Sequence, residues 1–399
     1  MHALRLLHKC IGKTCPRLHA KRLAALLVGV SALLKGQCLT LTNLGRHVGG
    51  SVGAKHSIKR IDRLLGNDFL TGERQQIYQC LAFLMMGQRR QIVILVDWSD
   101  VDAARTQHIL RASCIVNGRA FTLYEEVHKK EADPKIHKAF LLCLKAVLPP
   151  HCCPIIVTDA GFRRPWFITV EQMGWFYVGR VRNRDFVRKP QEQQWFPCKD
   201  LYQCANQIPR HIGVLWMTEK HPYQTNFYVV KCKSQKRKCY TKTGRVAANS
   251  RSKKIARRER EPWLLVSNLP QQYNQAKRIV SIYATRMQIE ESFRDLKNVR
   301  HGFKFEFQRC KTTQRVAILL LIATLATFVC WLMGLALESR GEHRLMQCNT
   351  TKHKRVLSIF FIGCEAIRHG YKSTHSECMS MCEKIRQLIN DQHQKLGLI

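Results

Sequence analysis

Two short apolar runs in the middle of the chain each end at an aspartate. Residues 92–96 form the first run, which stops at Asp97, and residues 155–158 form the second, which stops at Asp159. Continuous apolar runs of this length, bounded by polar residues, are typical of buried strands. We therefore predict two buried strands, each ending at a carboxylate.

The segment between these runs predicts a hairpin and a helix. Residues 108–116 and 119–127 flank Asn117-Gly118, a dipeptide that favours a two-residue hairpin turn. A helical pattern then begins at Pro134 and ends before a pair of prolines at 149–150. A helix in this place can return the chain so that strand 155–158 lies beside strand 92–96 and parallel to it.

This order of elements brings the two aspartates together. The carboxyl ends of adjacent parallel strands meet at one edge of a sheet, where α/β proteins commonly build their sites. We therefore expect Asp97 and Asp159 to stand side by side. Three antiparallel strands, a crossover helix and a further parallel strand predict a ribonuclease-H-like α/β fold for this part of the chain.

The first 85 or so residues predict short basic helices, at 17–34, 41–48 and 57–65. In the last of these the apolar and basic residues separate: Ile58, Ile61 and Leu65 lie on one face, and Lys59, Arg60 and Arg63 lie mostly elsewhere. Small helices of this kind are typical of DNA-binding modules, although a solvated charged face explains any single one of them equally well.

The region from about 183 to 269 changes to strand patterns, at 211–219, 226–233 and 263–268. The Lys- and Arg-rich stretch 231–260 interrupts them, which predicts a β-rich insertion that carries a basic loop. Residues 275–297 then predict one long helix.

The most apolar segment is 316–337, which contains no charged residue. Its length meets the criterion for a membrane-spanning helix, but threonine, alanine and glycine dilute its hydrophobicity. A buried helix at the centre of a large domain fits the length equally well and suits the rest of the chain better. We expect a core helix and no membrane, with a membrane span as the alternative, and a basic helical tail from about 340 to 399.

The charge balance narrows the class of partner. The 399 residues include 66 Lys and Arg against 28 Asp and Glu, which gives a formal net charge of +38 and a pI of about 10.0. Such an excess repels itself in the folded state and is usually compensated by a polyanion. Nucleic acid is the first candidate, a membrane surface the second, and packing against RNA in the manner of ribosomal proteins the third.

Eighteen cysteines are scattered along the chain, and His, Lys and Arg interrupt the first twenty residues, so we expect no secretory signal. This favours reduced thiols and a cytoplasmic location. His375, Cys378 and Cys382 make the best metal-like group, but no fourth ligand is obvious, so reduced thiols are the favoured interpretation.

The 275–297 helix gathers polar residues on one face. At about 100° per residue, the side chains of Tyr283, Arg286, Glu290 and Lys297 fall within an arc of roughly 60°. An apolar stripe adjoins them, formed by Ile279, Ile282, Ile289, Phe293 and Leu296. Charged residues at a helix border also form plain salt bridges, so this placement alone does not select Glu290.

Asp97, Asp159 and Glu290 together offer the hard oxygen ligands that Mg²⁺ or Mn²⁺ requires. Two such ions, roughly 3.5–4 Å apart, would serve phosphoryl transfer on a nucleic-acid backbone. Five other carboxylates lie nearby in the sequence, and spacing does not exclude them: Asp100, Glu125, Glu126, Glu291 and Asp295.

The spacing of four residues on this helix resembles a known signature. Tyr283-x2-Arg286-x3-Glu290-x6-Lys297 is similar to the Tyr–Arg–Glu–Lys pattern of DDE transposases of the insertion-sequence-four family. The local sequences 96–100, 158–162 and 286–291 look especially like the insertion-sequence-ten branch, whose element flanks a tetracycline-resistance composite transposon. The resemblance covers Lys59–Asn67 and most of residues 1–370, and it is weaker over the last thirty or so residues.

The resemblance implies a role for each matched residue. Asp97, Asp159 and Glu290 take the places of the metal-binding catalytic trio, and Tyr283, Arg286 and Lys297 those of residues that hold phosphates of the transposon end. Trp263 takes the place of a tryptophan that stacks on a flipped base, although a core aromatic at a strand start is the alternative. A relative has a second tryptophan where this chain has Met287, so the resemblance does not extend to that auxiliary contact.

The resemblance also implies a cut-and-paste reaction on double-stranded DNA, in which a homodimer joins two transposon ends and a DNA hairpin forms during excision. It further implies a location in the bacterial cytoplasm, associated with the nucleoid. We expect residues 1–85 to bind the DNA ends, 86–310 to be the catalytic domain, and 311–399 to serve synapsis or dimerisation. The alternatives are a ribonuclease-H-like nuclease or resolvase without strand transfer, an inactive DNA-binding relative of transposases, and a membrane protein.

Overall fold

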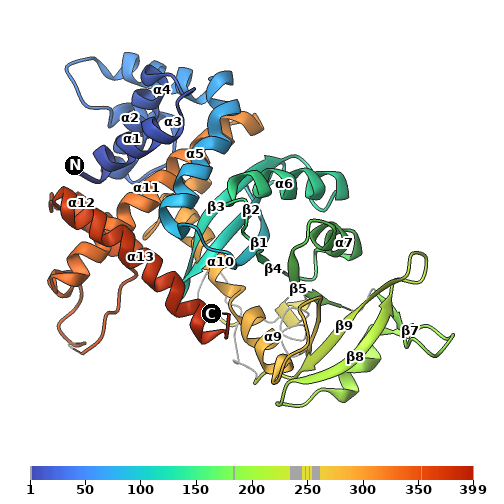
Figure 1. Ribbon diagram of the computed structural model, residues 1–399. Helices are drawn as coiled ribbons and strands as arrows, with labels where there is room; N and C mark the ends of the chain where they lie inside the picture. Colours follow the sequence, from blue (N-terminus) through green and yellow to red (C-terminus); the bar gives the residue numbers. More distant parts are fainter. Residues whose placement is uncertain are drawn as a thin grey trace.

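The structure is a computed structural model of the chain. It describes residues 2–182, 185–233, 245–247, 249–250, 252–253, 261–351 and 353–398. Most of the basic loop expected at 231–260 therefore lies outside the described residues. The N-terminal helices and the far end of a large sheet occupy opposite ends of the molecule, with the longest helices between them (Figure 1).

The described residues contain one ten-stranded mixed sheet, in the order β3-β2-β1-β4-β5-β10-β9-β8-β6-β7. Its strands are β1 (Val93–Asp100), β2 (His108–Val116), β3 (Arg119–His128), β4 (Ile155–Thr158), β5 (Phe176–Val181), β6 (Phe186–Arg188), β7 (Phe196–Pro197), β8 (Arg210–Met217), β9 (Tyr223–Val230) and β10 (Trp263–Ser267). The β1, β2 and β3 strands are antiparallel, and β4 pairs in parallel with both β1 and β5. This confirms the expected parallel pairing of the two strands that precede the aspartates.

Strand β1 continues beyond its expected end at Asp97. Its pairing with β4 stops at Val96 opposite Thr158, but its pairing with β2 runs on to Asp100 opposite His108. Asp97 therefore lies inside a strand whose β4 side is open, because β4 is only four residues long. The expectation that the strand stops at Asp97 is wrong, because the ladder to β2 extends a polar segment that has no apolar signal of its own.

Strand β10 lies within the range expected for a β-rich insertion, yet it pairs directly with β5 in the middle of the sheet. Strands β9, β8, β6 and β7 then extend the same sheet outward. The segment 183–269 thus enlarges the sheet rather than forming a separate one, because β10 offers a fully bonded edge to β9 on one side and to β5 on the other.

Helices cover both faces of the first half of the sheet. They are α6 (Pro134–Val147) and α7 (Arg164–Gln172), then α9 (Gln275–Ala284) and α10 (Met287–Lys297). Because side chains alternate along a strand, Trp98 of β1 contacts His137 of α6, whereas Asp97 and Ser99 contact α10. Helices α6 and α10 therefore lie against opposite faces of β1.

The helix expected over 275–297 is broken at Thr285-Arg286, so the expectation of one continuous helix is wrong. The Thr285 hydroxyl donates to the Ile282 carbonyl at 2.7 Å, and the Arg286 amide bonds back only three residues, to Tyr283. A threonine hydroxyl that bonds to the preceding turn competes with the regular helix pattern and tightens it locally. The break separates α9 from α10 and includes Arg286, the residue directly before α10.

Helices from both ends of the chain pack against one another and, in part, on the sheet. At the N-terminus these are α1 (His2–Thr14), α2 (Ala20–Gly36), α3 (Leu41–Arg46), α4 (Ala54–Leu65) and α5 (Asp68–Met86), and at the C-terminus α11 (Thr313–Ser339), α12 (Ile359–Arg368) and α13 (His375–Lys395), with short 3-10 turns at Cys198–Cys204, Phe305–Phe307 and Glu342–Met346. The pattern at 57–65 thus belongs to a longer helix, and α1 and α5 were not expected individually. Helix α3 packs closely on α4 because Gly45 has no side chain, since a Cβ there would lie 2.5 Å from the Cα of Ile58.

Helix α11 is the core helix that the apolar run 316–337 favoured. In the part of the chain that the structure describes, it is the one helix long and apolar enough to cross a membrane, and 94% of its most apolar window is buried inside the molecule. It contacts α2, α12 and β3, and Gly363 of α12 lies so near Cys330 that a Cβ would be 1.8 Å from the carbonyl oxygen. Protein, not lipid, therefore covers this helix.

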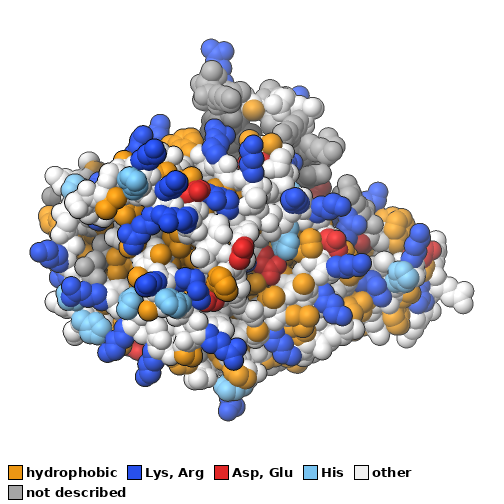
Figure 2. Space-filling view, turned by 90° about the horizontal axis from the view of Figure 1, so that it is seen from above, with side chains coloured by type: hydrophobic (Ala, Val, Ile, Leu, Met, Phe, Trp, Pro, Cys, Tyr) orange, Lys and Arg blue, Asp and Glu red, His pale blue; other side chains and the backbone are white. Residues whose placement is uncertain are grey.

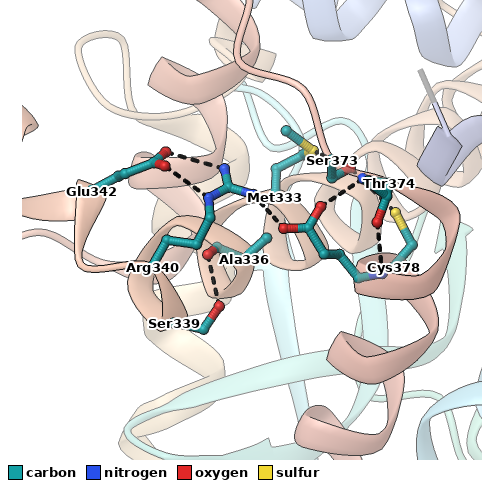
Figure 3. A network of polar contacts seen from close by, with 9 residues as sticks. Met333, Ala336, Ser339, Arg340, Glu342, Ser373, Thr374 and Cys378 are labelled. Atoms are coloured by element: carbon teal, nitrogen blue, oxygen red, sulfur yellow. Dashed lines mark hydrogen bonds and ion pairs between the residues drawn. The ribbon is translucent and has the colours of Figure 1, made fainter.

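A group of four residues, here called the C-terminal clamp, joins the end of α11 to the start of α13 (Figure 3). Arg340 donates to both carboxylate oxygens of Glu342, at 2.9 and 3.1 Å, and to Glu377 at 2.6 Å. Glu377 in turn accepts from the backbone amide of Thr374, whose hydroxyl accepts from the amide of Glu377. This reciprocal capping box satisfies the free amides at the start of α13.

The cysteines in the described part of the chain are all free thiols. His375 and Cys378 lie on α13, but the Cys378 thiol faces Ser373 at 3.3 Å and His375 is exposed. Within the described residues, His375, Cys378 and Cys382 do not bring their ligand atoms close enough together to hold one ion.

Candidate active site

Asp97 and Asp159 lie side by side at the edge of the sheet. Each follows the last residue of the β1–β4 ladder, in which Val96 of β1 is opposite Thr158 of β4. One oxygen of Asp97 accepts the amide of Trp98 at 2.9 Å, and one oxygen of Asp159 accepts the amide of Gly161 at 2.8 Å. These local bonds orient two neighbouring carboxylates at one edge.

Arg286 connects Glu290 to this pair. Its Nη1 lies 3.2 Å from Oδ2 of Asp97, and its Nη2 lies 2.6 Å from Oε1 of Glu290. The Arg286 and Asp97 side chains are about one-sixth exposed, whereas the Glu290 side chain is 44% exposed. Helix α10 therefore places Glu290 at the open side of the strand-end aspartates.

The charge at Asp97 is poorly compensated. Burial, together with repulsion from Asp159 and Glu290, raises the pKa of its carboxyl group to about 7, although the positive charge of Arg286 opposes this rise. A buried carboxylate beside others of its kind is stabilised in its ionised form by additional positive charge. Hard oxygen ligands at such a place suit a divalent cation such as Mg²⁺ or Mn²⁺.

A second acidic group lies near Asp97 and competes with it as a metal site. Asp100, His108 and Glu131 have all their ligand atoms within 4.8 Å of one another, which holds for no other group of three among the described residues. The Nδ1 atom of His108 lies 3.0 Å from Asp100 and 3.1 Å from Glu131, and Arg105 lies 3.0 Å from the other oxygen of Asp100. A cation from the protein, Arg105, thus already pairs with Asp100, and side-chain alternation along β1 places Asp100 on the face opposite Asp97.

The other rival carboxylates have partners elsewhere. Glu125 is fully buried and accepts hydrogen bonds from Arg111, Tyr78 and Thr324, which ties β3 to β2, α5 and α11. Glu126 accepts from Tyr124 and pairs with His128.

Arg119 pairs with both Glu291 and Asp295 of α10. Burial raises the pKa of Asp295 to about 7, and Arg119 opposes this. Neither carboxylate is joined to Asp97 or Asp159 by a recorded contact among the described residues, so the face of α10 that they share with β3 is distinct from the face that carries Glu290.

Tyr283 and Trp263 lie together beside the trio. Their rings meet edge to face with centroids 4.9 Å apart, and Tyr283 is buried while Trp263 is half-buried. Burial raises the pKa of the Tyr283 hydroxyl, and the positive charges of Arg286 and Arg180 oppose this. Arg180, on β5, was not expected from the sequence; its place one strand away from Asp159 is the signal that could have identified it.

Lys297 is used within the protein. Its ammonium group donates to the Ser99 hydroxyl at 2.8 Å and to the Asp100 carbonyl, so it fastens the end of α10 to β1. Burial and Arg111 lower its pKa. Among the expected phosphate ligands, Arg286 and Tyr283 are therefore near the trio. Lys297 lies at the other end of α10, about two helical turns after Glu290.

A groove of about 500 Å³ begins at Glu290 and follows α10. Its lining includes Glu290, Phe293, Arg294, Lys297, Arg300 and Glu306. Cations and one aromatic ring beside an acidic centre are the features of a surface that follows a nucleic-acid backbone. On the face shown in Figure 2, Lys and Arg are spread widely and acidic side chains are few.

Lys59, Arg60 and Arg63 are exposed on α4, in the N-terminal helices. Ile61 and Leu65 of the same helix are buried, so the expected separation of apolar and basic residues is present. The structure does not bring these three cations to the trio: α4 lies at the N-terminal end of the molecule, away from β4 and α9 (Figure 1).

Comparison with known proteins assigns the family. Residues 88–329, which are more than half of the chain and include Asp97, Asp159 and Glu290, match the model of the transposase DDE domain. No curated protein matches the chain. The chain therefore belongs to the family of transposases with a DDE domain.

Proposed function

We propose that this transposase binds the terminal inverted repeats of an insertion sequence, excises the element and joins it to target DNA by cut-and-paste transposition. The observation that carries the proposal is that Asp97 and Asp159 are neighbours at one sheet edge and that Arg286 joins Glu290 to Asp97. The strand order β3-β2-β1-β4-β5 supports a ribonuclease-H-like core around this edge. An insertion-sequence-four relationship, closest to the insertion-sequence-ten branch, is part of the proposal.

The donor set fits divalent cations. Three carboxylates supply hard oxygen atoms, and the raised pKa of Asp97 indicates that positive charge is needed there. Two Mg²⁺ or Mn²⁺ ions held by Asp97, Asp159 and Glu290 would stabilise the attacking and the leaving oxygen atoms during phosphoryl transfer. Arg286 and Tyr283 then orient the phosphate, and Lys297 holds α10 against β1 so that Glu290 keeps its position.

The same residues would serve every step, because each step is an in-line displacement at phosphorus. Water attacks the phosphorus at the transposon end, and the bond to the 3′-oxygen breaks and leaves a 3′-hydroxyl. This hydroxyl attacks a phosphorus of the opposite strand, which displaces the 3′-oxygen of the flanking DNA and closes a hairpin on the transposon end. Water attacks the hairpin phosphorus and restores the 3′-hydroxyl, which then attacks a target phosphorus and displaces a 3′-hydroxyl of the target strand. Trp263, half-buried at the edge of the trio beside Tyr283, would stack on a base flipped from the strained hairpin end.

Two regions outside the sheet would bind the DNA ends and support dimerisation. The exposed Lys59, Arg60 and Arg63 of α4 would contact the phosphates of the DNA end, and residues 311–399 would support a homodimer that joins two ends. Replacing the three cations with alanine should reduce the slope of log affinity against log salt by about 2.7, because each lost phosphate contact contributes about 0.9. An unchanged slope would contradict phosphate contact by α4.

Strand transfer with Mg²⁺ tests the proposal, on DNA that carries both ends of the element and on a target plasmid. Glu290→Ala should lose cleavage and joining but keep end binding, because one carboxylate is removed and the basic surface is not. Glu291→Ala is the matched control, because it removes the carboxylate next to Glu290 in the sequence, and the Glu291 carboxylate pairs with Arg119 and Arg294. Full activity of Glu290→Ala would contradict the assignment; cleavage without joining by the native chain would indicate a nuclease or resolvase, and end binding without cleavage an inactive relative.

A further inference from the structure

The guanidinium group of Arg286 lies between two of the carboxylates assigned to the metal ions. It gives one nitrogen to Asp97, at 3.2 Å, and the other to Glu290, at 2.6 Å. The second nitrogen also lies 3.3 Å from the sulfur of Met287. Three contacts on two different elements, β1 and α10, thus fix this group in one orientation.

This position is the one that a cation shared by the two carboxylates would need. Divalent ions such as Mg²⁺ bind carboxylate oxygens at about 2.0–2.1 Å, and a shared ion brings its ligands close together. Within the described residues, the ligand atoms of Asp97, Asp159 and Glu290 do not all lie within 4.8 Å of one another. Those of Asp100, His108 and Glu131 do. A planar guanidinium with one nitrogen toward each carboxylate holds them further apart than an ion would.

The remaining oxygens are less restricted. One oxygen of Asp97 already accepts the Trp98 amide, and Arg286 takes the other. Among the described residues, no recorded hydrogen bond reaches Oε2 of Glu290 or Oδ2 of Asp159. Metal ions can therefore approach Asp159 and the outer side of Glu290 directly, but they meet Arg286 at the oxygens between Asp97 and Glu290.

We propose that Arg286 is an internal counter-cation that competes with divalent metal for Asp97 and Glu290, and that a phosphate group of bound DNA draws it away. The inference rests on the proposed function of the trio. A guanidinium has two parallel donors that suit a phosphate as well as a carboxylate, so it has a second partner of the same geometry. Its side chain is 16% exposed, which leaves it within reach of a ligand at the open edge.

Coupling between metal and DNA follows from this competition. When DNA removes Arg286 from the carboxylates, metal binds them more tightly, and bound metal in turn strengthens the hold on the phosphate. In the DNA-free protein the carboxylates are already neutralised in part, so the metal affinity is low. The arrangement would confine the fully assembled metal site to the state in which DNA is in place.

Mn²⁺ binding to the full chain without DNA tests this inference, measured as the electron paramagnetic resonance signal of unbound Mn²⁺. Arg286→Ala and Arg286→Gln should bind Mn²⁺ at least about fivefold more tightly than the native chain, since the coupling of two ligands is typically of this order or larger. Arg286→Lys keeps a cation and should bind more weakly than either neutral variant. Glutamine keeps most of the side-chain volume, so it serves if the alanine variant does not fold.

Two controls separate this inference from the proposed function. Arg294→Ala removes the same charge from the same helix, but its side chain is 64% exposed and pairs with Glu291, so solvent screening should keep the change within about twofold. Asp97→Asn should weaken Mn²⁺ binding in an Arg286→Gln background. If Asp97→Asn weakens Mn²⁺ binding but the neutral Arg286 variants bind Mn²⁺ no more tightly than the native chain, the metal site is supported and the role of Arg286 as a counter-cation is contradicted. If Asp97→Asn has no effect, both the metal site and the inference fail.

Discussion

Two arginines in this molecule each connect a pair of carboxylates, but their surroundings differ. In the C-terminal clamp, Arg340 contacts Glu342 with two nitrogens and Glu377 with a third, all within 3.1 Å. The backbone amide of Thr374 lowers the pKa of Glu377, followed by Arg340. Every charged group in the clamp thus has a hydrogen-bonded partner.

At the sheet edge, Arg286 faces Asp97 and Glu290 with one nitrogen each, and Asp159 adds a third carboxylate. Burial and Asp159 raise the pKa of Asp97 to about 7. The clamp is therefore a completed ion pair, whereas the sheet edge is short of positive charge. We therefore interpret the clamp as a structural contact and the sheet edge as a site that binds a metal cation and a phosphate.

The largest expected difference between the two regions is in strand joining after Arg286 or Arg340 is replaced by alanine. Arg286→Ala should reduce strand joining at least about 100-fold, because a donor to the reacting phosphate is lost. Arg340→Ala should leave joining within about fivefold of the native rate, since it affects only surface-exposed ion pairs far from the trio. Joining by both variants in the same assay measures this, and an equal loss for both would remove the distinction between the regions.

Asp97→Asn should stabilise the metal-free protein above neutral pH. The folded pKa of Asp97, about 7, lies above the ordinary value of 3.8, so the folded protein holds this proton more tightly than the unfolded chain does. The native chain therefore loses stability as the pH rises from about 4 to about 7, by up to about 4 kcal/mol, and asparagine removes that loss.

Urea unfolding in the presence of a chelator, at pH 5 and at pH 8, measures this effect. The variant should already be the more stable chain at pH 5, by roughly 1.6 kcal/mol, and its advantage should grow to about 4 kcal/mol at pH 8. Equal stability of the two chains at pH 8 would show that the charge of Asp97 is already compensated, as the charges of the clamp are.

The smallest expected effect is loss of the capping box. Thr374→Ala should cost about 1 kcal/mol of unfolding free energy at neutral pH, which is the usual cost of losing an N-cap hydroxyl, and should leave joining unchanged. Ser339→Ala is the control, because that hydroxyl only donates to the Ala336 carbonyl within its own helix. Urea unfolding compares the two, and a loss of joining in Thr374→Ala would give the clamp a part in the reaction.

The sequence predicted the elements whose signals are local. Prolines bound helix α6 at both ends, Asn117-Gly118 sets the β2–β3 hairpin, and a four-residue apolar run matches β4. The parallel pairing of β1 with β4 followed from the crossover helix between them, and with it the meeting of Asp97 and Asp159.

Features that depend on contacts between residues far apart in the sequence could not be predicted from it. The segment 98–100 has no apolar alternation, and only the ladder to β2 makes it a strand. Glu125 is excluded as a metal ligand because the register between β2 and β3 places it against Arg111, and a bulge at 112–113 shifts that register. The break at Thr285-Arg286 depends on a single threonine hydroxyl. Glu290 was selected by its place in a four-residue signature, and the Arg286 contact is the structural observation that joins it to Asp97.

Asp97 and Asp100 provide the most direct test of the central claim, since they lie three residues apart on opposite faces of β1 and each belongs to an acidic group. The measurement is Mg²⁺-dependent cleavage and joining of transposon-end DNA by Asp97→Asn and Asp100→Asn. We predict that Asp97→Asn loses at least about 100-fold in both reactions and that Asp100→Asn stays within about tenfold of the native chain. The opposite result, a loss in Asp100→Asn with Asp97→Asn active, would contradict the account and place the metal at Asp100, His108 and Glu131.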